Sequence, residues 1–265
     1  MRDASDRVIW PVKPRTPKAA ITTELRNLRL GESDITYTLK RSARRRTIAF
    51  QIDHEGLSVL VPSRASDGQI SRAIQSRLTW IEARLAEWAT KPKPDEIRFE
   101  TGDQLPWRGE LLDLIVRDLD KGVRTRIEAT DTTLTVWVDP ATVGAIRTAA
   151  VRGAVRRWYR KQAETHLTPR VLVHAEALGQ TVSKVMIRDQ KRRWGSCDSH
   201  GAIRLNWRLI MMPDALSDYV CAHEAAHLIE ANHSPAFWAV VERRIPDWKA
   251  RRKAINELSV QLPLL

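Results

Sequence analysis

The stretch CAHEAAHLIEANHSPAFW, residues 221–238, contains three of the seven histidines in this sequence of 265 residues. Residues 223–227 read HEAAH, which has the form HExxH. On a helix, positions four apart lie on the same face, so His223 and His227 can bind one metal ion together. Glu224 lies one residue further round the helix, where it can take a proton from a metal-activated water without being a ligand.

His233 is the predicted third ligand, because a catalytic zinc site usually has three protein ligands and one open position. Ser234-Pro235 is typical of an N-cap and the first residue of a new helix. The helix that carries HExxH should therefore end near residues 230–231. Asn232 can adopt the left-handed conformation that ends helices, so the chain can bring His233 back to the metal.

The whole motif has the spacing HExxHxxxxxH, which metzincins share. Metzincins place a glycine at the position of Glu230, however, and no Met-turn signature follows here. Glu230 and Glu242 stay alternative third ligands, since some zincins use a glutamate. The motif predicts a Zn²⁺-dependent hydrolase, foremost a metallopeptidase, in which metal-activated water attacks the scissile bond and Glu224 is the catalytic base.

The composition is that of a globular protein with an excess of basic residues. Lys and Arg number 44 and Asp and Glu 32, for a formal charge of +12. This charge permits contact with nucleic acid, but a solvated, arginine-rich surface explains it equally well. Two cysteines suit a reducing compartment. The N-terminus lacks a secretory signal, and no apolar run reaches the ~18 residues of a membrane span. We expect a soluble, cytoplasmic protein.

The first half of the chain is predicted to be rich in β-strands. Ser66 and Gln69 form a capping box that begins one helix, whose apolar stripe continues to Trp88. The segments before this helix are expected to form a small antiparallel sheet, and a second β set follows it. The expected strands are residues 35–40, 46–52, 57–62, 105–109, 110–118, 123–129 and 133–139.

The second half is predicted to be mainly helical. One helix is expected over residues 141–166, and Thr168-Pro169 begins a second one that ends at Gly179. A β-hairpin then pairs residues 182–189 with residues 202–210. Pro213-Asp214 begins the helix of the HExxH motif, and no internal repeat is evident.

Five segments, in this order, resemble the YgjP-like metallopeptidases, distant relatives of SprT-like and WLM zinc peptidases. They are RWGSC (193–197), IRLNWRLI (203–210), HEAAH (223–227), NHSPAFW (232–238) and PDWKARR (246–252). The resemblance covers about residues 35–258. It implies a zincin-type catalytic domain that binds peptide or protein in extended form, with residues 202–210 as the strand that pairs with the substrate.

The resemblance also implies that His223, His227 and His233 are metal ligands and that Glu224 is the general base. The predicted fold is therefore α+β: a zincin-like helical catalytic domain with an active-site helix and a preceding β-hairpin, plus an N-terminal antiparallel β-rich part. Three regions are expected. They are a flexible N-terminal tail (1–30), a β-rich region with one helix (31–139) and the metallopeptidase domain (140–262).

The substrate and the oligomeric state are not indicated by the sequence. Basic residues 191–193 beside a Lewis acid would also suit a phosphate-bearing substrate. A metal-dependent phosphohydrolase acting on a nucleotide is therefore an alternative, as is a peptidase associated with nucleic acid. Arg193 is a candidate for stabilising an oxyanion, and Trp194 is either a rim or a core residue. Cys197 as a fourth ligand would close the open metal position.

Overall fold

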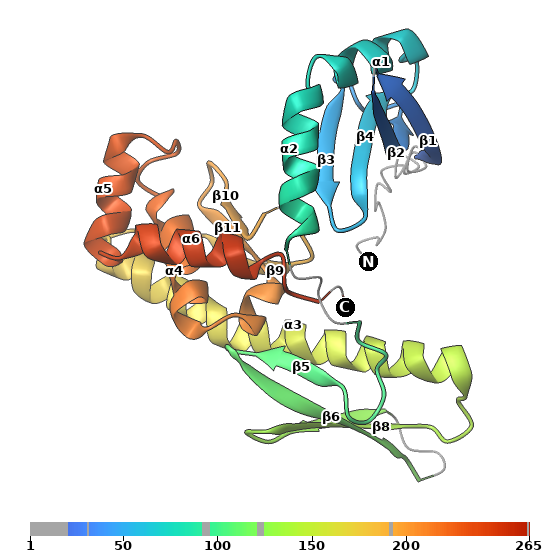
Figure 1. Cartoon of the computed structure of the whole chain (residues 1–265). Helices are drawn as coiled ribbons and strands as arrows, with labels where there is room; N and C mark the ends of the chain where they lie inside the picture. Colours follow the sequence, from blue (N-terminus) through green and yellow to red (C-terminus); the bar gives the residue numbers. More distant parts are fainter. Residues whose placement is uncertain (1–20, 31, 92–95, 121–124, 191–192, 264) are drawn as a thin grey trace, which may run out of the picture. The chain divides into compact units, whose positions relative to one another are not determined.

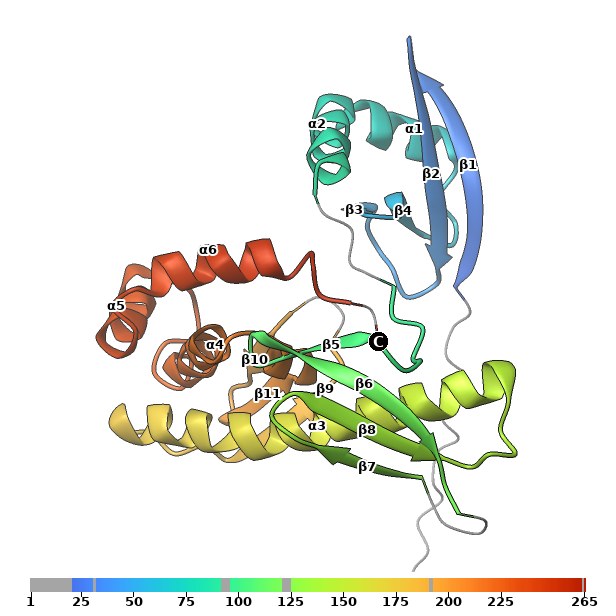
Figure 2. The same ribbon diagram turned by 60° about the horizontal axis from the view of Figure 1, so that its bottom comes forward.

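The computed structural model describes residues 21–30, 32–91, 96–120, 125–190, 193–263 and 265. By compactness the chain divides into two units, Met1–Lys91 and Pro92–Leu265. Each unit is described by itself (Figures 1 and 2). The described residues form six α-helices and three small sheets, which confirms the predicted α+β class. None of the described helices is both long and apolar enough to span a membrane.

The first unit is a four-stranded sheet, ordered β1-β2-β4-β3, with two helices. The central pair β2 and β4 runs parallel, whereas the two outer pairs are antiparallel. The sheet is therefore mixed and not purely antiparallel, because β4 turns back from β3 and inserts between β3 and β2. The elements are β1 (Thr22–Leu30), β2 (Ser33–Ser42), β3 (Ala49–Asp53), β4 (Gly56–Pro62), α1 (Asp67–Gln75) and α2 (Leu78–Ala89).

Strand β1 lies in the segment that was expected to be a flexible tail. It pairs with β2 along its whole length, from Thr22 opposite Arg41 to Leu30 opposite Ser33. Most of its side chains are exposed, so the strand lacks the apolar alternation by which a sequence reveals a strand. The tail prediction is wrong for this part, and residues 1–20 lie outside the described residues.

The predicted helix after Ser66 begins as expected but is divided in two. The Gln69 N–H donates to Ser66 Oγ at 3.3 Å and the Ser66 N–H donates to Gln69 Oε1 at 2.9 Å, which confirms the capping box. The chain breaks at residues 76–77, and α2 then packs separately on the sheet. The break still leaves apolar side chains from both helices in one core, which includes Leu39, Val59, Ile70, Ile74 and Ile81.

The second unit begins with another four-stranded sheet, ordered β5-β6-β8-β7. Its outer pairs are antiparallel and its central pair is parallel, as in the first unit. The two sheets therefore share strand order and direction, although no repeat was evident in the sequence. The strands are β5 (Gln104–Trp107), β6 (Glu110–Asp118), β7 (Arg126–Ala129) and β8 (Thr133–Val138).

Helix α3 (Gly144–Ala177) is continuous and contains Pro169, so the prediction of a new helix at Thr168 is wrong. Proline in a helix loses one hydrogen bond and costs about 3 kcal/mol. Buried side chains nevertheless recur on one face on both sides of Pro169, and a leucine or valine among them contributes about 1.5–3 kcal/mol when fully buried. These side chains keep the helix in register with the core, and they include Ala163, Leu167, Val171 and Ala175.

Helix α3 contacts both the β5–β8 sheet and the helical part of the second unit (Figure 1). Trp107 of β5 lies against Trp158 with ring centres 4.7 Å apart, and the Tyr159 hydroxyl donates to the Pro106 carbonyl at 2.6 Å. The boundary predicted between residues 139 and 140 therefore falls inside a compact unit. The assignment of the metallopeptidase domain to residues 140–262 stays a prediction.

The third sheet has the order β10-β11-β9, with β9 (Lys184–Arg188), β10 (Gly195–Cys197) and β11 (Ala202–Asn206). β11 pairs antiparallel with β10 and parallel with β9, so the predicted hairpin of residues 182–189 with 202–210 is wrong. The antiparallel partner of β11, β10, lies between the two predicted hairpin strands, where a loop was expected. β11 ends at Asn206, whose side-chain oxygen accepts from the Arg208 N–H at 3.1 Å and starts a 3₁₀ helix, η1 (Trp207–Met211).

Three helices complete the second unit: α4 (Asp214–Ala226), α5 (Pro235–Arg244) and α6 (Trp248–Leu258). α4 ends at Ala226, earlier than the predicted end near residues 230–231, and the turn after it replaces the expected left-handed Asn232. Among the described non-glycine residues, only Phe99 and Arg108 have positive φ. The N-cap at Ser234 is confirmed, since its Oγ accepts from the Phe237 N–H at 3.3 Å.

Candidate metal centre

The first turn of α4 is fixed by Asp214, which pairs with two arginines from other elements. Arg108, in the turn between β5 and β6, binds both carboxylate oxygens, and Arg170 of α3 lies 2.7 Å from Oδ2. These two guanidinium groups, Arg108 first, hold the pKa of Asp214 below its usual range. The adjacent Gly109 has φ +92°, and a Cβ there would lie 2.9 Å from Pro213 Cγ, so only glycine permits this close approach.

The three predicted histidines lie together at the end of α4 and in the turn after it. His223 and His227 are one helical turn apart, with ring centres separated by 5.1 Å. His233 Nε2 lies 3.0 Å from His223 Nε2. One ligand atom from each ring lies within 4.8 Å of the others. Two nitrogens bound tetrahedrally to one ion would be about 3.4 Å apart, so the three rings fit a shared metal ion.

The protonation of these rings also suits metal binding. Burial, followed by the nearby His227 and His233, lowers the pKa of His223 to about 3. Burial likewise lowers the pKa of His227. His227 Nδ1 donates to the Glu230 carbonyl at 3.0 Å, which leaves Nε2 unprotonated and able to face an ion. Neutral imidazoles are the form that binds metal, so no proton must first be displaced from His223 or His227 at neutral pH.

Glu224 is almost fully buried beside these rings, with 4% of its surface exposed. Its Oε2 has no hydrogen-bond partner among the described residues. Burial raises its pKa to about 8, and the positive charge of Arg193 opposes this rise. A carboxylate with these properties can accept and release a proton near neutral pH.

Strand β10 forms a wall directly against Glu224. A Cβ at Gly195 would lie 2.4 Å from Glu224 Oε1 and 2.6 Å from its Cδ and Cγ, so a side chain at this position does not fit. β10 is held to β11, and the Asn206 N–H donates to the Trp194 carbonyl at 2.8 Å. Sequence reasoning placed Gly195 in a loop and assigned it no role, because the contact joins residues 29 positions apart.

Two aromatic residues of α5 surround the histidines and were also missed. Phe237 lies 4.4–4.9 Å, between ring centres, from all three histidine rings. Trp238 stacks on His233 at 5.7 Å with an interplanar angle of 26°. The sequence could have indicated them, because both lie in the first turn after the Ser-Pro cap. The helix that begins at this cap starts next to His233.

Several other predicted candidates lie outside the histidine group. Among the described residues the group includes neither Glu230 nor Glu242, the alternative ligands, nor Cys197. Burial raises the pKa of the Cys197 thiol to about 11, so it stays protonated. Trp194 is half-buried against the core, which favours the structural role considered for it. Arg193 is exposed.

A basic stripe on α3, formed by Arg152, Arg156 and Arg160 at four-residue spacing, contacts other side chains of the second unit. Arg156 lies 3.0 Å and Arg160 3.6 Å from Asp189, and Arg152 lies over the Phe99 ring at 5.0 Å. Lys191 and Arg192, the other basic residues of the predicted phosphate site, lie outside the described residues. The structure therefore adds no support for a nucleic-acid or phosphate site on this stripe.

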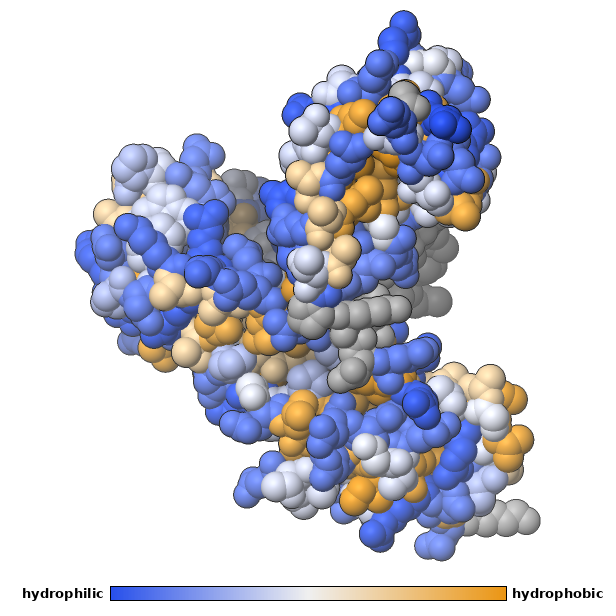
Figure 3. Space-filling model, viewed as in Figure 1, coloured by the Kyte–Doolittle hydropathy of each residue, from blue (hydrophilic) through white to orange (hydrophobic). Residues whose placement is uncertain are grey.

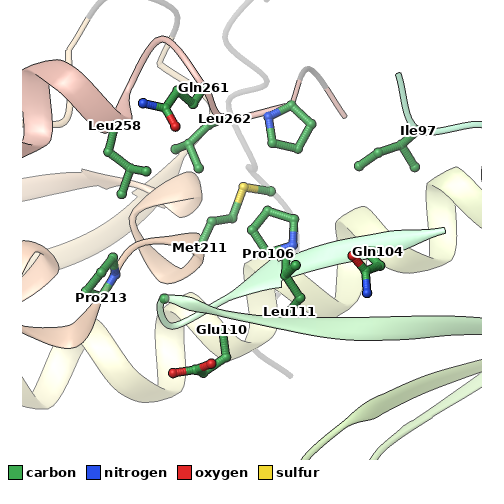
Figure 4. A pocket seen from close by; sticks show the side chains of 12 residues that line it. Ile97, Gln104, Pro106, Glu110, Leu111, Met211, Pro213, Leu258, Gln261 and Leu262 are labelled. Carbon is green, nitrogen blue, oxygen red and sulfur yellow. The ribbon is translucent and has the colours of Figure 1, made fainter. Parts of the chain in front are cut away.

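A separate pocket of about 280 Å³ lies elsewhere in the second unit (Figure 4). Residues from the β5–β6 turn, the segment before α4 and the C-terminal segment line it, among them Leu111, Met211, Pro213 and Leu262. None of the three histidines and neither Glu224 nor Gly195 lines this pocket. It is therefore not part of the metal centre.

Comparison with known proteins gives matches of different strength. The sequence profile of the YgjP-like family, metallopeptidase domain, matches residues 46–258. Among solved structures, abylysin, a metallopeptidase zymogen of Pyrococcus abyssi, aligns with 37% of this chain and 99% of its own, at 23% identity and a TM-score of 0.33. No curated protein matches the chain.

Proposed function

Because this chain belongs to the YgjP-like metallopeptidase family, we propose that it is a zinc-dependent peptidase whose ion is held by His223, His227 and His233. The observation that carries this assignment is the convergence of three imidazoles beside one buried carboxylate. Three imidazole ligands that leave one position open are a common donor set of catalytic zinc.

In the proposed reaction the bound ion and Glu224 have different roles. A bound zinc ion supplies a Lewis acid that polarises the scissile carbonyl and lowers the pKa of water. Glu224 Oε2, which has no partner among the described residues, accepts the proton of the attacking water and returns it to the leaving amine. Burial raises the pKa of Glu224 to about 8, and a zinc ion bound nearby would lower it. The ion would therefore favour the unprotonated base at pH 7.

The substrate strand proposed here pairs with β10 and not with residues 202–210. β11 already has β10 and β9 on its two sides, so its backbone is not available along Ala202–Asn206. β10 is an edge strand in the described sheet, and its Gly195 touches Glu224. An extended peptide that adds to this edge would lie next to the base.

The test compares purified wild type with Glu224→Gln for bound zinc and for hydrolysis of a mixed peptide library. The variant should keep its zinc, because the three histidines are unchanged, and should lose hydrolysis by at least about 10²-fold, the usual contribution of a general base. Full activity of Glu224→Gln would refute the mechanism. A parallel assay with nucleotide phosphates tests the phosphohydrolase alternative, which predicts release of phosphate and no peptide cleavage.

Two further expectations stay predictions. A cytoplasmic location would be tested by cell fractionation. Association with nucleic acid would be tested by binding at low and high salt, since phosphate contacts weaken steeply as salt rises.

A further inference from the structure

A cation without a carboxylate partner lies beside the histidine cluster. The Arg252 guanidinium on α6 lies 5.1 Å from the centre of the Trp238 ring. That ring stacks on His233 at 5.7 Å and lies 5.8 Å from His223, between ring centres. Arg252 therefore contacts an aromatic ring that itself contacts two of the three histidines.

The neighbouring arginine on α6, Arg251, is paired with carboxylates, whereas among the described residues Arg252 is not. Arg251 Nε lies 2.9 Å from Asp247, and its Nη1 lies 3.9 Å from Asp218. Arg252 is exposed, and in the part of the chain that the structure describes no carboxylate lies within ion-pair distance of it. Hydrophilic residues cover most of the surface over α5 and α6 in Figure 3.

A second unpaired cation reaches the site from another element. Arg193 precedes β10, and its carbonyl accepts from Asn206 Nδ2 at 3.3 Å, which fixes its backbone two residues from Gly195. Its side chain is exposed, and no described carboxylate forms an ion pair with it. A Cβ at Gly195, two residues further along the chain, would lie 2.4 Å from Glu224 Oε1, so the Arg193 backbone is close to the base. The two cations thus approach the HExxH motif from different elements.

We propose that Arg193 and Arg252 form two anion-binding subsites beside the metal centre, so that the protein prefers peptides with acidic side chains next to the scissile bond. This inference rests on the proposed peptidase function. Guanidinium groups bind carboxylates through charge-assisted hydrogen bonds, and a lysine-bearing peptide would be repelled by both cations. Two cations on separate elements suit carboxylates spaced along an extended peptide better than one compact phosphate.

The experiment measures binding of uncleaved peptides to zinc-loaded Glu224→Gln protein by calorimetry. Peptides are matched in pairs that differ only in Glu against Gln, on one or the other side of the cleaved bond. The Glu peptide should bind up to about fivefold more tightly per carboxylate, the upper range for exposed ion pairs. The preference should decrease as salt rises, because these cations are exposed to solvent.

Variants at Arg252 distinguish an effect of its positive charge on peptide preference from a structural effect of the substitution. Arg252→Gln should remove the preference at one side of the bond, and Arg252→Glu should reverse it in favour of a lysine peptide. Lys253→Gln is the matched control, since it removes one positive charge from α6 at a side chain that is 79% exposed and lies 3.8 Å from Glu257. The control should leave the preference unchanged.

Equal binding of the Glu and Gln peptides to the parent protein would overturn the inference, as would the same loss of preference in Lys253→Gln. Displacement of the peptide by inorganic phosphate at equal concentration would also overturn it, in favour of a phosphate ligand. Failure of the peptidase function gives a different result, namely unchanged hydrolysis by Glu224→Gln. The peptide-binding assay therefore tests the anion-binding subsites, and the hydrolysis assay tests the peptidase function.

Discussion

Replacing Gly195 by alanine should disable the site while leaving its metal in place. The added Cβ would lie 2.4 Å from Glu224 Oε1 and 2.6 Å from Cδ and Cγ. The stem of the glutamate is contacted as well as its end, so rotation of the carboxylate alone cannot relieve the overlap. Glu224 is buried on α4 and Gly195 is paired with Leu205 of β11, so neither backbone is free to move far.

The size of the effect follows from these distances. Non-bonded carbons are normally about 3.5–4.0 Å apart, so Glu224 and β10 must separate by about 1 Å. A misplacement of about 1 Å at a catalytic group can cost about 10²-fold in rate. Overpacking of a buried contact costs about 1–3 kcal/mol in the free energy of unfolding. We therefore expect kcat to fall about 10²-fold in a protein that is less stable but still folded.

The assay measures kcat and KM for a peptide substrate, bound zinc and urea unfolding on the same preparations. Gly153→Ala is the matched control: the glycine lies inside α3, and its added Cβ would meet only the end of the flexible Arg157 side chain, at 3.3 Å. This control should keep full activity and gain about 0.5–1 kcal/mol in unfolding free energy, since alanine favours helix over glycine. Wild-type kcat in Gly195→Ala would refute the view that β10 positions Glu224.

Three further predictions concern the metal, the pH dependence and α3. His233→Ala should lose most of its zinc in a metal assay after dialysis, whereas retention of zinc would refute its role as a ligand. In the metal-free protein, the free energy of unfolding should fall by about 1.4 kcal/mol per pH unit from pH 6.5 to 8, because folded Glu224 keeps a proton up to about pH 8 that the unfolded chain has already released. Below pH 6.5 the lowered pKa of His223 has the opposite effect, so the free energy of unfolding should rise with pH there. Comparing urea unfolding of wild type and Glu224→Gln isolates the contribution of the glutamate. Pro169→Ala should raise the free energy of unfolding by up to ~3 kcal/mol, since the new N–H can bond to the Thr165 carbonyl; an unchanged urea midpoint would contradict this.

The part of the site that could be predicted from the sequence is the part that depends on local geometry. His223, Glu224 and His227 are placed by one helix, and His233 is placed by the Ser234 cap of the next one. A helix period and a cap are properties of a few neighbouring residues, so they can be read without knowledge of the fold. The same reasoning put the end of α4 about four residues too late, because tertiary packing decides where a helix end frays.

The missed features of the fold depend on tertiary packing or on strand pairing. β10 is three residues long and is a strand only because β11 pairs with it. β1 is mostly exposed and is defined by its partner β2. Pro169 predicted a helix boundary, and the core face of α3 outweighed it. In each case strand pairing or core packing decides the structure, and neither hydrophobic periodicity nor helix and strand propensity reveals these contacts.

The way β5 is joined to the active-site segment decides how far the chain can be shortened. The Arg108 N–H donates to the Ile210 carbonyl at 2.9 Å and the Gly109 N–H to the Met211 carbonyl at 3.3 Å, directly before α4. A fragment starting at residue 140 would lose these bonds and expose the face of α3 that includes Tyr159, which is now fully buried. Such a fragment should aggregate when expressed, whereas one starting at residue 96 keeps β5 and its contacts. The smallest expressible catalytic fragment therefore includes the β5–β8 sheet.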